Sequence, residues 1–126
     1  MELVIRSLCC LVQLVVRCVR CLVQLGDWAL AALPEGARLD DATRDKALHV
    51  YGRATALDPK SYKAWHAWAM INFEVVSQTD GAKHVVPAVR GFFRSIALGR
   101  ERALQDILRL LTLWFNYGPS PEVDAA

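Results

Sequence analysis

The stretch ALHVYGRATALDPKSYKAW, residues 47–65, has the most specific pattern in this 126-residue chain. Ala47 and Ala54 lie two helical turns apart, so both side chains fall on one face of a helix. Small side chains at these positions let a neighbouring helix approach closely, and Tyr51 lies between them to fill the remaining space. The pattern therefore predicts a helix that packs tightly on another helix.

A turn into a second helix follows within the same stretch. Asp58 can cap that helix, and Pro59 can be its first residue, where the missing N–H removes no hydrogen bond. Alanines and an aromatic residue on one helix, a proline at the turn and Trp65 at the start of the next helix are typical of tetratricopeptide repeats. We therefore predict an all-α fold, an α-solenoid of tetratricopeptide- or HEAT-like helical hairpin repeats.

The composition agrees with a stacked helical array. Hydrophobic residues make up 54% of the chain, and in an array each repeat needs neighbours on both sides to cover its apolar surface. The net charge is only +2, and no basic run alternates with aromatic residues. These features argue against nucleic-acid binding, so we expect no nucleic acid among the partners.

The apolar N-terminal stretch 3–25 could be mistaken for a membrane span. Arg6, Arg17 and Arg20 interrupt it, whereas a spanning helix needs about 20 mostly apolar residues. No small-residue cleavage site follows it, as one would in a signal peptide. We expect a buried amphipathic helix and no transmembrane segment, with contact at a membrane interface as the alternative.

All four cysteines lie in this stretch, at Cys9, Cys10, Cys18 and Cys21. Cys18 and Cys21 form a CxxC pair, a spacing found in zinc sites and redox dithiols. No histidine lies nearby, and a free cysteine commonly packs as a small apolar residue. We therefore expect reduced cysteines packed in the core, and we assign no metal site to them.

Hydrophobic periodicity predicts five helices. The first covers 2–33 and is broken or kinked near Gly26, and the second ends at Leu57 and can be capped by Asp40 or Asp41. The other three lie at 60–76, 85–98 and 104–117. Gly99 is expected to end the fourth helix, because glycine commonly follows a helix. The aromatic residues expected at packing or interaction positions are Trp65, Trp68, Phe73, Phe92, Phe93, Trp114 and Phe115. The predicted apolar stripe of the fifth helix is Leu104, Ile107, Leu108, Leu111, Trp114 and Phe115.

Residues that could carry catalysis are scattered. His49, His66 and His84 have no cysteine or serine partner at a diagnostic spacing, and neither a glycine-rich phosphate loop nor a kinase motif is present. Asp106 lies three residues before Arg109, which predicts a solvated ion pair on a helix surface. We assign no catalytic, cofactor-binding or metal-binding residue to this chain, and we expect His66 to be structural.

Basic residues gather around the fourth helix, at Lys83, Arg90, Arg94, Arg100 and Arg102. Arg90 and Arg94 lie one turn apart and share a helix face. This face is either simply solvated or a surface that docks an acidic partner segment or a polyphosphate. The sequence leaves both interpretations open.

Three blocks in order along the chain carry a family resemblance: SYKAWHAWAMINFEV at 61–75, VPAVRGFFRSIALG at 86–99 and LQDILRLLTLWFNYG at 104–118. Together with LGDW at 25–28, they resemble the FAT domain of the TOR (target of rapamycin) protein kinases, which are PI3K-related kinases. Generic tetratricopeptide repeats do not share GFFRSI or LTLWFNYG. The resemblance covers residues 22–123; residues 1–21 form an apolar, cysteine-rich helix that matches poorly, and residues 124–126 a tail.

The resemblance implies an α-solenoid that curls around a kinase domain as a clamp, within a very large serine/threonine kinase of nutrient and growth signalling. The implied partners are that kinase domain, neighbouring helical repeats of the parent chain and subunits of TOR complexes. ATP and Mg²⁺ would be bound by the kinase domain of the parent protein, so we expect neither cofactor in this chain. The implied location is the cytoplasm, with association with endomembranes through complex partners as a further expectation.

The alternative is a free-standing helical-repeat adaptor that binds a partner peptide, whereas no constellation supports an independent enzyme. An adaptor should have polar terminal faces, because it has to remain soluble on its own. A scaffold segment of a longer array should instead expose apolar helix faces at both ends. The apolar first and fifth helices favour the scaffold segment.

Overall fold

The computed structural model describes residues 1–79 and 82–117, with the side chains of residues 12–17 and 79 excepted. The described part contains five α-helices and no strand: α1 (Glu2–Ala31), α2 (Asp41–Leu57), α3 (Tyr62–Thr79), α4 (Val85–Gly99) and α5 (Leu104–Tyr117). Short 3₁₀ turns, Ala82–His84 and Arg100–Ala103, precede α4 and α5. The expected all-α class is confirmed. Residues 80–81 and 118–126, which include the tail at 124–126, lie outside the described residues.

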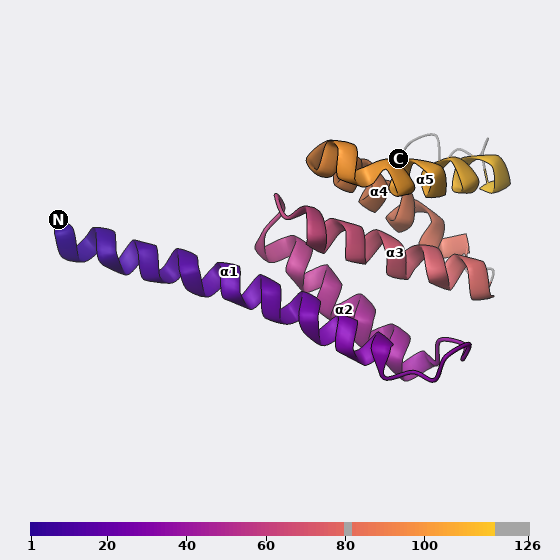
Figure 1. Cartoon of the computed structure of the whole chain (residues 1–126), viewed down its shortest axis with the longest axis horizontal. Helices are drawn as coiled ribbons and strands as arrows, with labels where there is room; N and C mark the ends of the chain where they lie inside the picture. The colour runs from indigo at the N-terminus through magenta and orange to yellow at the C-terminus, as the bar shows by residue number, and fades with distance from the viewer. Residues whose placement is uncertain (80–81, 118–126) are drawn as a thin grey trace.

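The helices stack in chain order, as Figure 1 shows. Each helix packs on the helix before it, and α3 also contacts α1, which is the arrangement of consecutive helical hairpins in a solenoid. The N-terminal half of α1 projects well beyond the other helices (Figure 1). The stack therefore has two terminal faces, one on α1 and one on α5.

Close packing of α1 on α2 depends on a glycine. A Cβ atom at Gly26 would lie 2.5 Å from Cε1 of Tyr51, whose side chain is 2% exposed. The Tyr51 hydroxyl donates a hydrogen bond of 2.6 Å to Asp27 Oδ1, and burial, together with this bond and the Asp27 charge, raises the pKa of Tyr51. The predicted break near Gly26 is wrong, because α1 continues through this residue and the glycine instead provides room for the tyrosine ring.

The starts of α2 and α3 are fixed by different caps. Asp40 Oδ1 accepts a 2.6 Å hydrogen bond from the Thr43 amide, as predicted, and this bond lowers the pKa of Asp40. At α3 the cap is Ser61, whose Oγ accepts from the Ala64 amide at 3.2 Å. The prediction of Asp58 as that cap is wrong, because Asp58 ends α2 and its carboxylate accepts a bond within the intervening turn.

The core between α3, α4 and α5 is built on Phe92, which is fully buried. Phe73 meets it edge-on with ring centroids 5.9 Å apart, a favourable aromatic geometry. Gly91 lets α4 approach α3, because a Cβ at that position would lie 2.8 Å from the Cβ of Ala69. Phe93, the next residue, is 54% exposed and lies outside this core.

Gly99 ends α4 at the predicted position but for a different reason. Its φ is −87°, so no left-handed conformation is needed there, and the positive φ of 50° belongs to Arg100. A Cβ at Gly99 would lie 2.5 Å from the Tyr62 ring. The glycine therefore serves the close approach of α3 to the end of α4.

Candidate interaction surfaces

Most of the large hydrophobic side chains of α5 face away from the rest of the molecule. The most buried residues of α5 are Asp106 and Leu113, which are 1% and 2% exposed. Trp114 and Phe115 are 47% and 79% exposed. Six exposed residues form what we call the outer α5 face: Leu104, Ile107, Leu108, Leu111, Trp114 and Phe115. The stripe predicted for the fifth helix is therefore exposed in the described structure, which agrees with the apolar end faces expected of a scaffold segment.

A buried carboxylate fixes the orientation of α5. Asp106 Oδ2 accepts hydrogen bonds from Ser95 Oγ of α4 at 2.9 Å and from His66 Nδ1 of α3 at 2.8 Å. Its Oδ1 accepts from Arg109 at 3.1 Å. A buried carboxylate requires such partners, so the first turn of α5 must face α3 and α4. The ion pair of Asp106 and Arg109 was predicted to be solvated, but its carboxylate instead joins three helices.

Tyr62 covers this junction. Its ring stacks on His66 with centroids 5.5 Å apart, and its hydroxyl donates to the carbonyl oxygen of Arg102 at 3.2 Å. The Arg102 guanidinium lies 5.1 Å from the centroid of the same ring, within cation–π range. Burial, and then the negative charge of Asp106, raise the pKa of Tyr62. His66 thus belongs to a structural hydrogen-bond network, as the sequence led us to expect.

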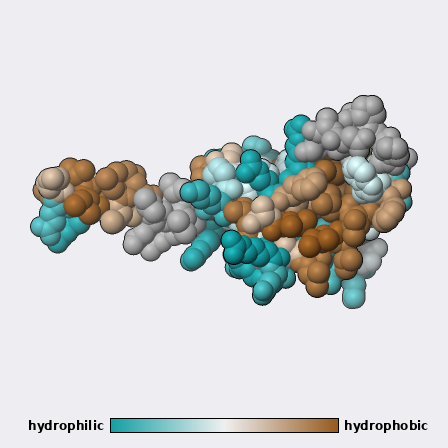
Figure 2. Space-filling model, turned by 90° about the horizontal axis from the view of Figure 1, so that it is seen from above, coloured by the Kyte–Doolittle hydropathy of each residue, from teal (hydrophilic) through white to brown (hydrophobic). Residues whose placement is uncertain are grey.

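The outer α5 face is a continuous hydrophobic surface. Figure 2 views the molecule from the α5 side and shows hydrophobic residues gathered there, with hydrophilic residues around them. Isolated exposed leucines are common on soluble proteins, but a contiguous group of large side chains marks an interaction surface. The outer α5 face therefore has the character of a helix face that another element covers.

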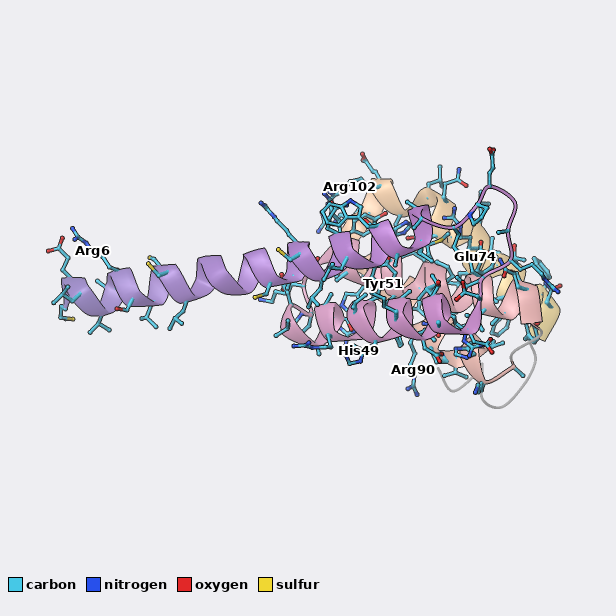
Figure 3. All side chains as sticks on the ribbon, turned by 90° about the horizontal axis from the view of Figure 1, so that it is seen from below. Arg6, His49, Tyr51, Glu74, Arg90 and Arg102 are labelled. Carbon is cyan, nitrogen blue, oxygen red and sulfur yellow. The ribbon has the colours of Figure 1, made fainter. Side chains whose placement is uncertain are left out.

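The N-terminal part of α1 forms a second apolar end. Leu3, Val4, Ile5, Leu8 and Leu11 are all more than half exposed, and Cys9, Cys10, Cys18 and Cys21 are exposed and form no disulfide. The expectation that the cysteines pack in the core is wrong. Cys9 and Cys10 lie on the half of α1 that projects past its neighbours, with Arg6 near its tip (Figure 3), and Cys18 and Cys21 are exposed beside the buried Val19. Within the described residues, none of the helices combines the length and the hydrophobicity that crossing a membrane requires.

A third surface, which we call the α4 cleft, is a hollow of about 690 Å³. Its lining comes from three helices, with Gly52 and Thr55 from α2, Trp65 and Trp68 from α3, and Pro87, Arg90, Phe93 and Arg94 from α4. The structure thus brings five of the predicted site residues together, although the sequence did not indicate a shared cleft. The Arg94 guanidinium lies 5.8 Å from the centroid of a Trp65 ring. The remaining predicted residues are elsewhere, in the core (Phe73 and Phe92) and on the outer α5 face (Trp114 and Phe115).

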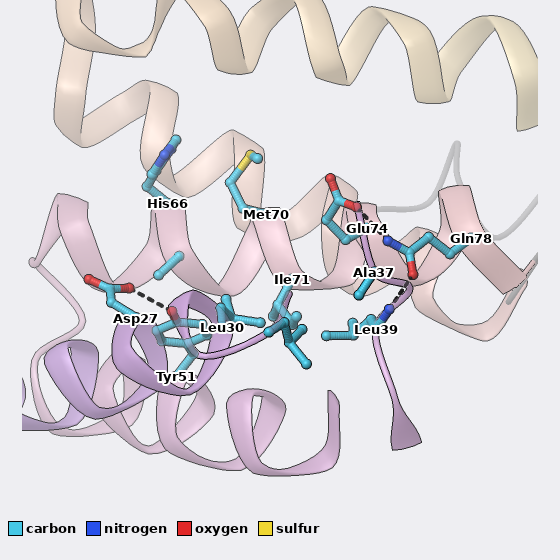
Figure 4. A pocket seen from close by; sticks show the side chains of 12 residues that line it. Asp27, Leu30, Ala37, Leu39, Tyr51, His66, Met70, Ile71, Glu74 and Gln78 are labelled. Carbon is cyan, nitrogen blue, oxygen red and sulfur yellow. Dashed lines mark hydrogen bonds between the residues drawn. The ribbon is translucent and has the colours of Figure 1, made fainter. Parts of the chain in front are cut away.

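A smaller hollow of about 370 Å³ lies between α1, the following loop and α3 (Figure 4). Its walls are mostly apolar, and its polar groups already have partners. Asp27 accepts from Tyr51, and Gln78 accepts from the Leu39 amide at 2.9 Å and donates to Glu74 at 3.1 Å. These bonds hold the loop after α1 against α3, so the polar residues of this hollow serve the fold.

The remaining histidines do not form a catalytic or metal-binding group. His84 Nδ1 lies 3.0 Å from Oδ1 of Asn72, and Asn72 Nδ2 in turn donates to the Trp68 carbonyl oxygen. Burial is the main cause that lowers the pKa of His84, and the positive charge of Lys83 adds to it. No group of His, Cys, Asp and Glu side chains in the described part of the chain could hold a metal ion.

The fold and these surfaces define a class of protein: a stacked α-helical repeat array with apolar terminal faces. Residues 5–112 match the model of the FAT domain family, and the chain therefore belongs to that family.

The curated proteins to which the chain is similar include several serine/threonine-protein kinases. The chain is similar to the serine/threonine-protein kinase tor1 of Schizosaccharomyces pombe, with 45% identity over 96 residues that cover 68% of this chain and 4% of the relative. It is also similar to the serine/threonine-protein kinase mTor of Drosophila melanogaster, with 42% identity over 117 residues, 68% of this chain and 5% of the relative. A third relative is the serine/threonine-protein kinase TOR of Oryza sativa subsp. japonica, 44% identical over 115 residues, 81% of this chain and 4% of the relative. The chain thus spans about a twentieth of the length of these kinases.

Proposed function

We propose that this chain is part of the FAT helical scaffold of a TOR-like serine/threonine protein kinase, where it braces the kinase domain and supports complex assembly. The observation that carries this proposal is the pair of apolar terminal faces, on α1 and on the outer α5 face. In a repeat array such faces are covered by the preceding and following repeats. The polar terminal faces that a free-standing adaptor would need are not found on either end of the described structure.

The scaffold role also accounts for the chemistry of the described residues. Buried polar groups among these residues bond to one another between helices. We place ATP and Mg²⁺ in the kinase domain of the parent protein, with the neighbouring repeats, that kinase domain and TOR complex subunits as partners. The proposed location is the cytoplasm, with association with endomembranes through those partners.

The outer α5 face supplies a test in a longer TOR protein that contains this segment. Leu108→Ser, Leu111→Ser and Phe115→Ser together should leave the described helices intact, because these side chains are 52%, 46% and 79% exposed in this structure. They should nevertheless weaken packing of the following repeat, lower the thermal unfolding temperature of the longer protein and reduce its recovery in complexes. The measurements are thermal unfolding, limited proteolysis and kinase activity of the purified assembly.

A matched control replaces Gln105 and Thr112 of α5 by Ser, because both are exposed but polar. This control should behave as the unmodified protein in all three measurements. Equal stability, assembly and kinase activity of the triple Ser variant would show that the outer α5 face is not an internal face of a scaffold.

A further inference from the structure

The α4 cleft combines aromatic walls with two guanidinium groups, a combination that the scaffold role does not require. Arg90 and Arg94 lie on one face of α4, one turn apart, and both are exposed. Figure 3 shows Arg90 projecting outward on the side of the molecule where His49 lies, while Arg102 is on the opposite side. The cleft is thus separate from the Tyr62 network and from the outer α5 face.

The aromatic floor of the cleft is held rigidly. Trp68 is wedged between two glycines, because a Cβ at Gly52 or at Gly91 would lie 3.3 Å or 3.1 Å from atoms of its ring. Trp65 is fixed by a 2.8 Å hydrogen bond from its Nε1 to the Pro59 carbonyl oxygen. A rigid aromatic surface needs little ordering when a ligand binds, which favours affinity.

The positive charge of the cleft is not neutralised within the described residues. No acidic residue lines the cleft, and neither Arg90 nor Arg94 lies within ion-pair distance of a described carboxylate. Arg44, by comparison, bonds both Asp41 and Asp45. The cleft therefore presents a positive potential that selects an anionic ligand.

The apolar side chains of the cleft favour a peptide over a small inorganic anion. Phe93 is 54% exposed at the cleft, and Pro87 and Trp65 add further apolar surface beside the guanidinium groups. A compact inorganic anion would leave this wall exposed, whereas a peptide can place a carboxylate on an arginine and a hydrophobic side chain on the wall.

We propose that the α4 cleft docks an acidic peptide segment in which carboxylates flank a hydrophobic or aromatic side chain. Arg90 and Arg94 bind the carboxylates, and Phe93, Trp65 and Trp68 contact the hydrophobic side chain. A volume of about 690 Å³ is within the range of ligand sites that accept several side chains. This docking site is independent of the scaffold proposal, because it does not use either terminal face.

The test measures binding of a fluorescein-labelled peptide, Glu-Glu-Leu-Phe-Glu-Glu, to the full chain by fluorescence anisotropy. The same peptide with every Glu replaced by Gln should bind about tenfold more weakly or not at all, because charge-assisted hydrogen bonds carry the selectivity. Arg90→Glu/Arg94→Glu should lower the affinity for the acidic peptide about tenfold or more, and added salt should weaken binding to the unmodified chain. Phe93→Ala should lower affinity for both peptides.

The matched control is Lys46→Glu/Lys63→Glu, which changes net charge equally at exposed residues that do not line the cleft. It should bind the acidic peptide within about twofold of the unmodified chain, since distant exposed charges are screened. Circular dichroism and urea unfolding establish that each variant is folded, and Arg90→Gln/Arg94→Gln replaces the charge-reversed pair if that pair unfolds.

Three results would overturn the proposal. The first is absence of binding by the unmodified chain, and the second is equal affinity for the Glu and Gln peptides. The third is binding of inorganic tripolyphosphate that depends on Arg90 and Arg94 when the acidic peptide does not bind, which would make the cleft a phosphate site. A control pair that lost affinity as strongly as the cleft pair would count against it as well.

Discussion

Replacement of Asp106 should release α5 from the stack. Asp106 is 1% exposed and receives one hydrogen bond from each of α3, α4 and α5, through His66, Ser95 and Arg109. Asp106→Ala removes all three bonds and leaves a space beside α4.

The expected magnitude follows from the exposure of the three partners. Hydrogen bonds to a charged group contribute about 1.5–3 kcal/mol each, and removal of one member of a buried ion pair costs about 3–5 kcal/mol. The side chains of His66 and Arg109 are 37% and 30% exposed, so both can bond to water after the substitution. Ser95 is fully buried but keeps its bond to the Phe92 carbonyl oxygen. We therefore expect Asp106→Ala to lower the free energy of unfolding by about 2–4 kcal/mol.

The assay is urea unfolding followed by circular dichroism, combined with hydrogen exchange to locate the change. Asp106→Asn keeps the size of the side chain but removes its charge, so it should cost about half as much. Amide protection should fall most in α5, whereas α1 and α2, which Asp106 does not contact, should change little. Glu35→Gln, at an exposed loop residue, is the matched control. The reasoning fails if Asp106→Ala unfolds at the same urea concentration as Glu35→Gln, or if protection falls evenly along the chain.

Three further predictions concern single side chains. Phe92→Ala should lower the free energy of unfolding by about 3–5 kcal/mol, because Phe92 is fully buried. Trp114→Ala should lower it by under about 1 kcal/mol, because Trp114 is 47% exposed. Urea unfolding compares the two variants directly, and equal losses would place Trp114 in the core. Gly99→Ala should cost about 1–3 kcal/mol, because its Cβ would lie 2.5 Å from the Tyr62 ring; an unchanged unfolding midpoint would refute this contact. Burial and the charge of Lys83 lower the pKa of His84, so the unfolded chain binds the proton more readily than the folded chain does. The free energy of unfolding should therefore fall as the pH drops below about 6.5. This fall should be smaller in His84→Gln, and an identical pH profile of the free energy of unfolding in both proteins would contradict the lowered pKa.

The all-α class and the helix limits could be predicted because they depend on local signals. The Asp40 side chain accepts a hydrogen bond from the Thr43 amide within the same turn, so residues close in sequence determine where α2 starts. The small residues Ala47 and Ala54 are fully buried, on the helix face where their spacing of two turns placed them. The family resemblance likewise depended on contiguous blocks, and the match of residues 5–112 to the FAT domain confirms it.

Contacts between distant residues could not be predicted from the same signals. His66 and Asp106 are 40 positions apart, and neither residue differs in type from an ordinary surface residue. From the sequence, Gly26 is interpreted as a break and Gly99 as a helix stop. Their actual role is to make room for the rings of Tyr51 and Tyr62, which belong to other helices and therefore leave no local signal. Arg90 and Trp65 line one cleft only because α4 packs on α3, and the sequence does not specify this packing directly.

The orientation of α5 shows why a hydrophobic stripe does not by itself locate a core. In a stacked array a helix has a neighbour on each side, so it needs two packing faces, and the stripe indicates only the more hydrophobic one. In α5 the less hydrophobic face packs inward, because Asp106 can be buried only where His66 and Ser95 meet it, whereas leucines can be covered by any apolar neighbour. Polar groups therefore determine which side of α5 faces α3 and α4, and the more apolar side is the one that remains exposed in this structure.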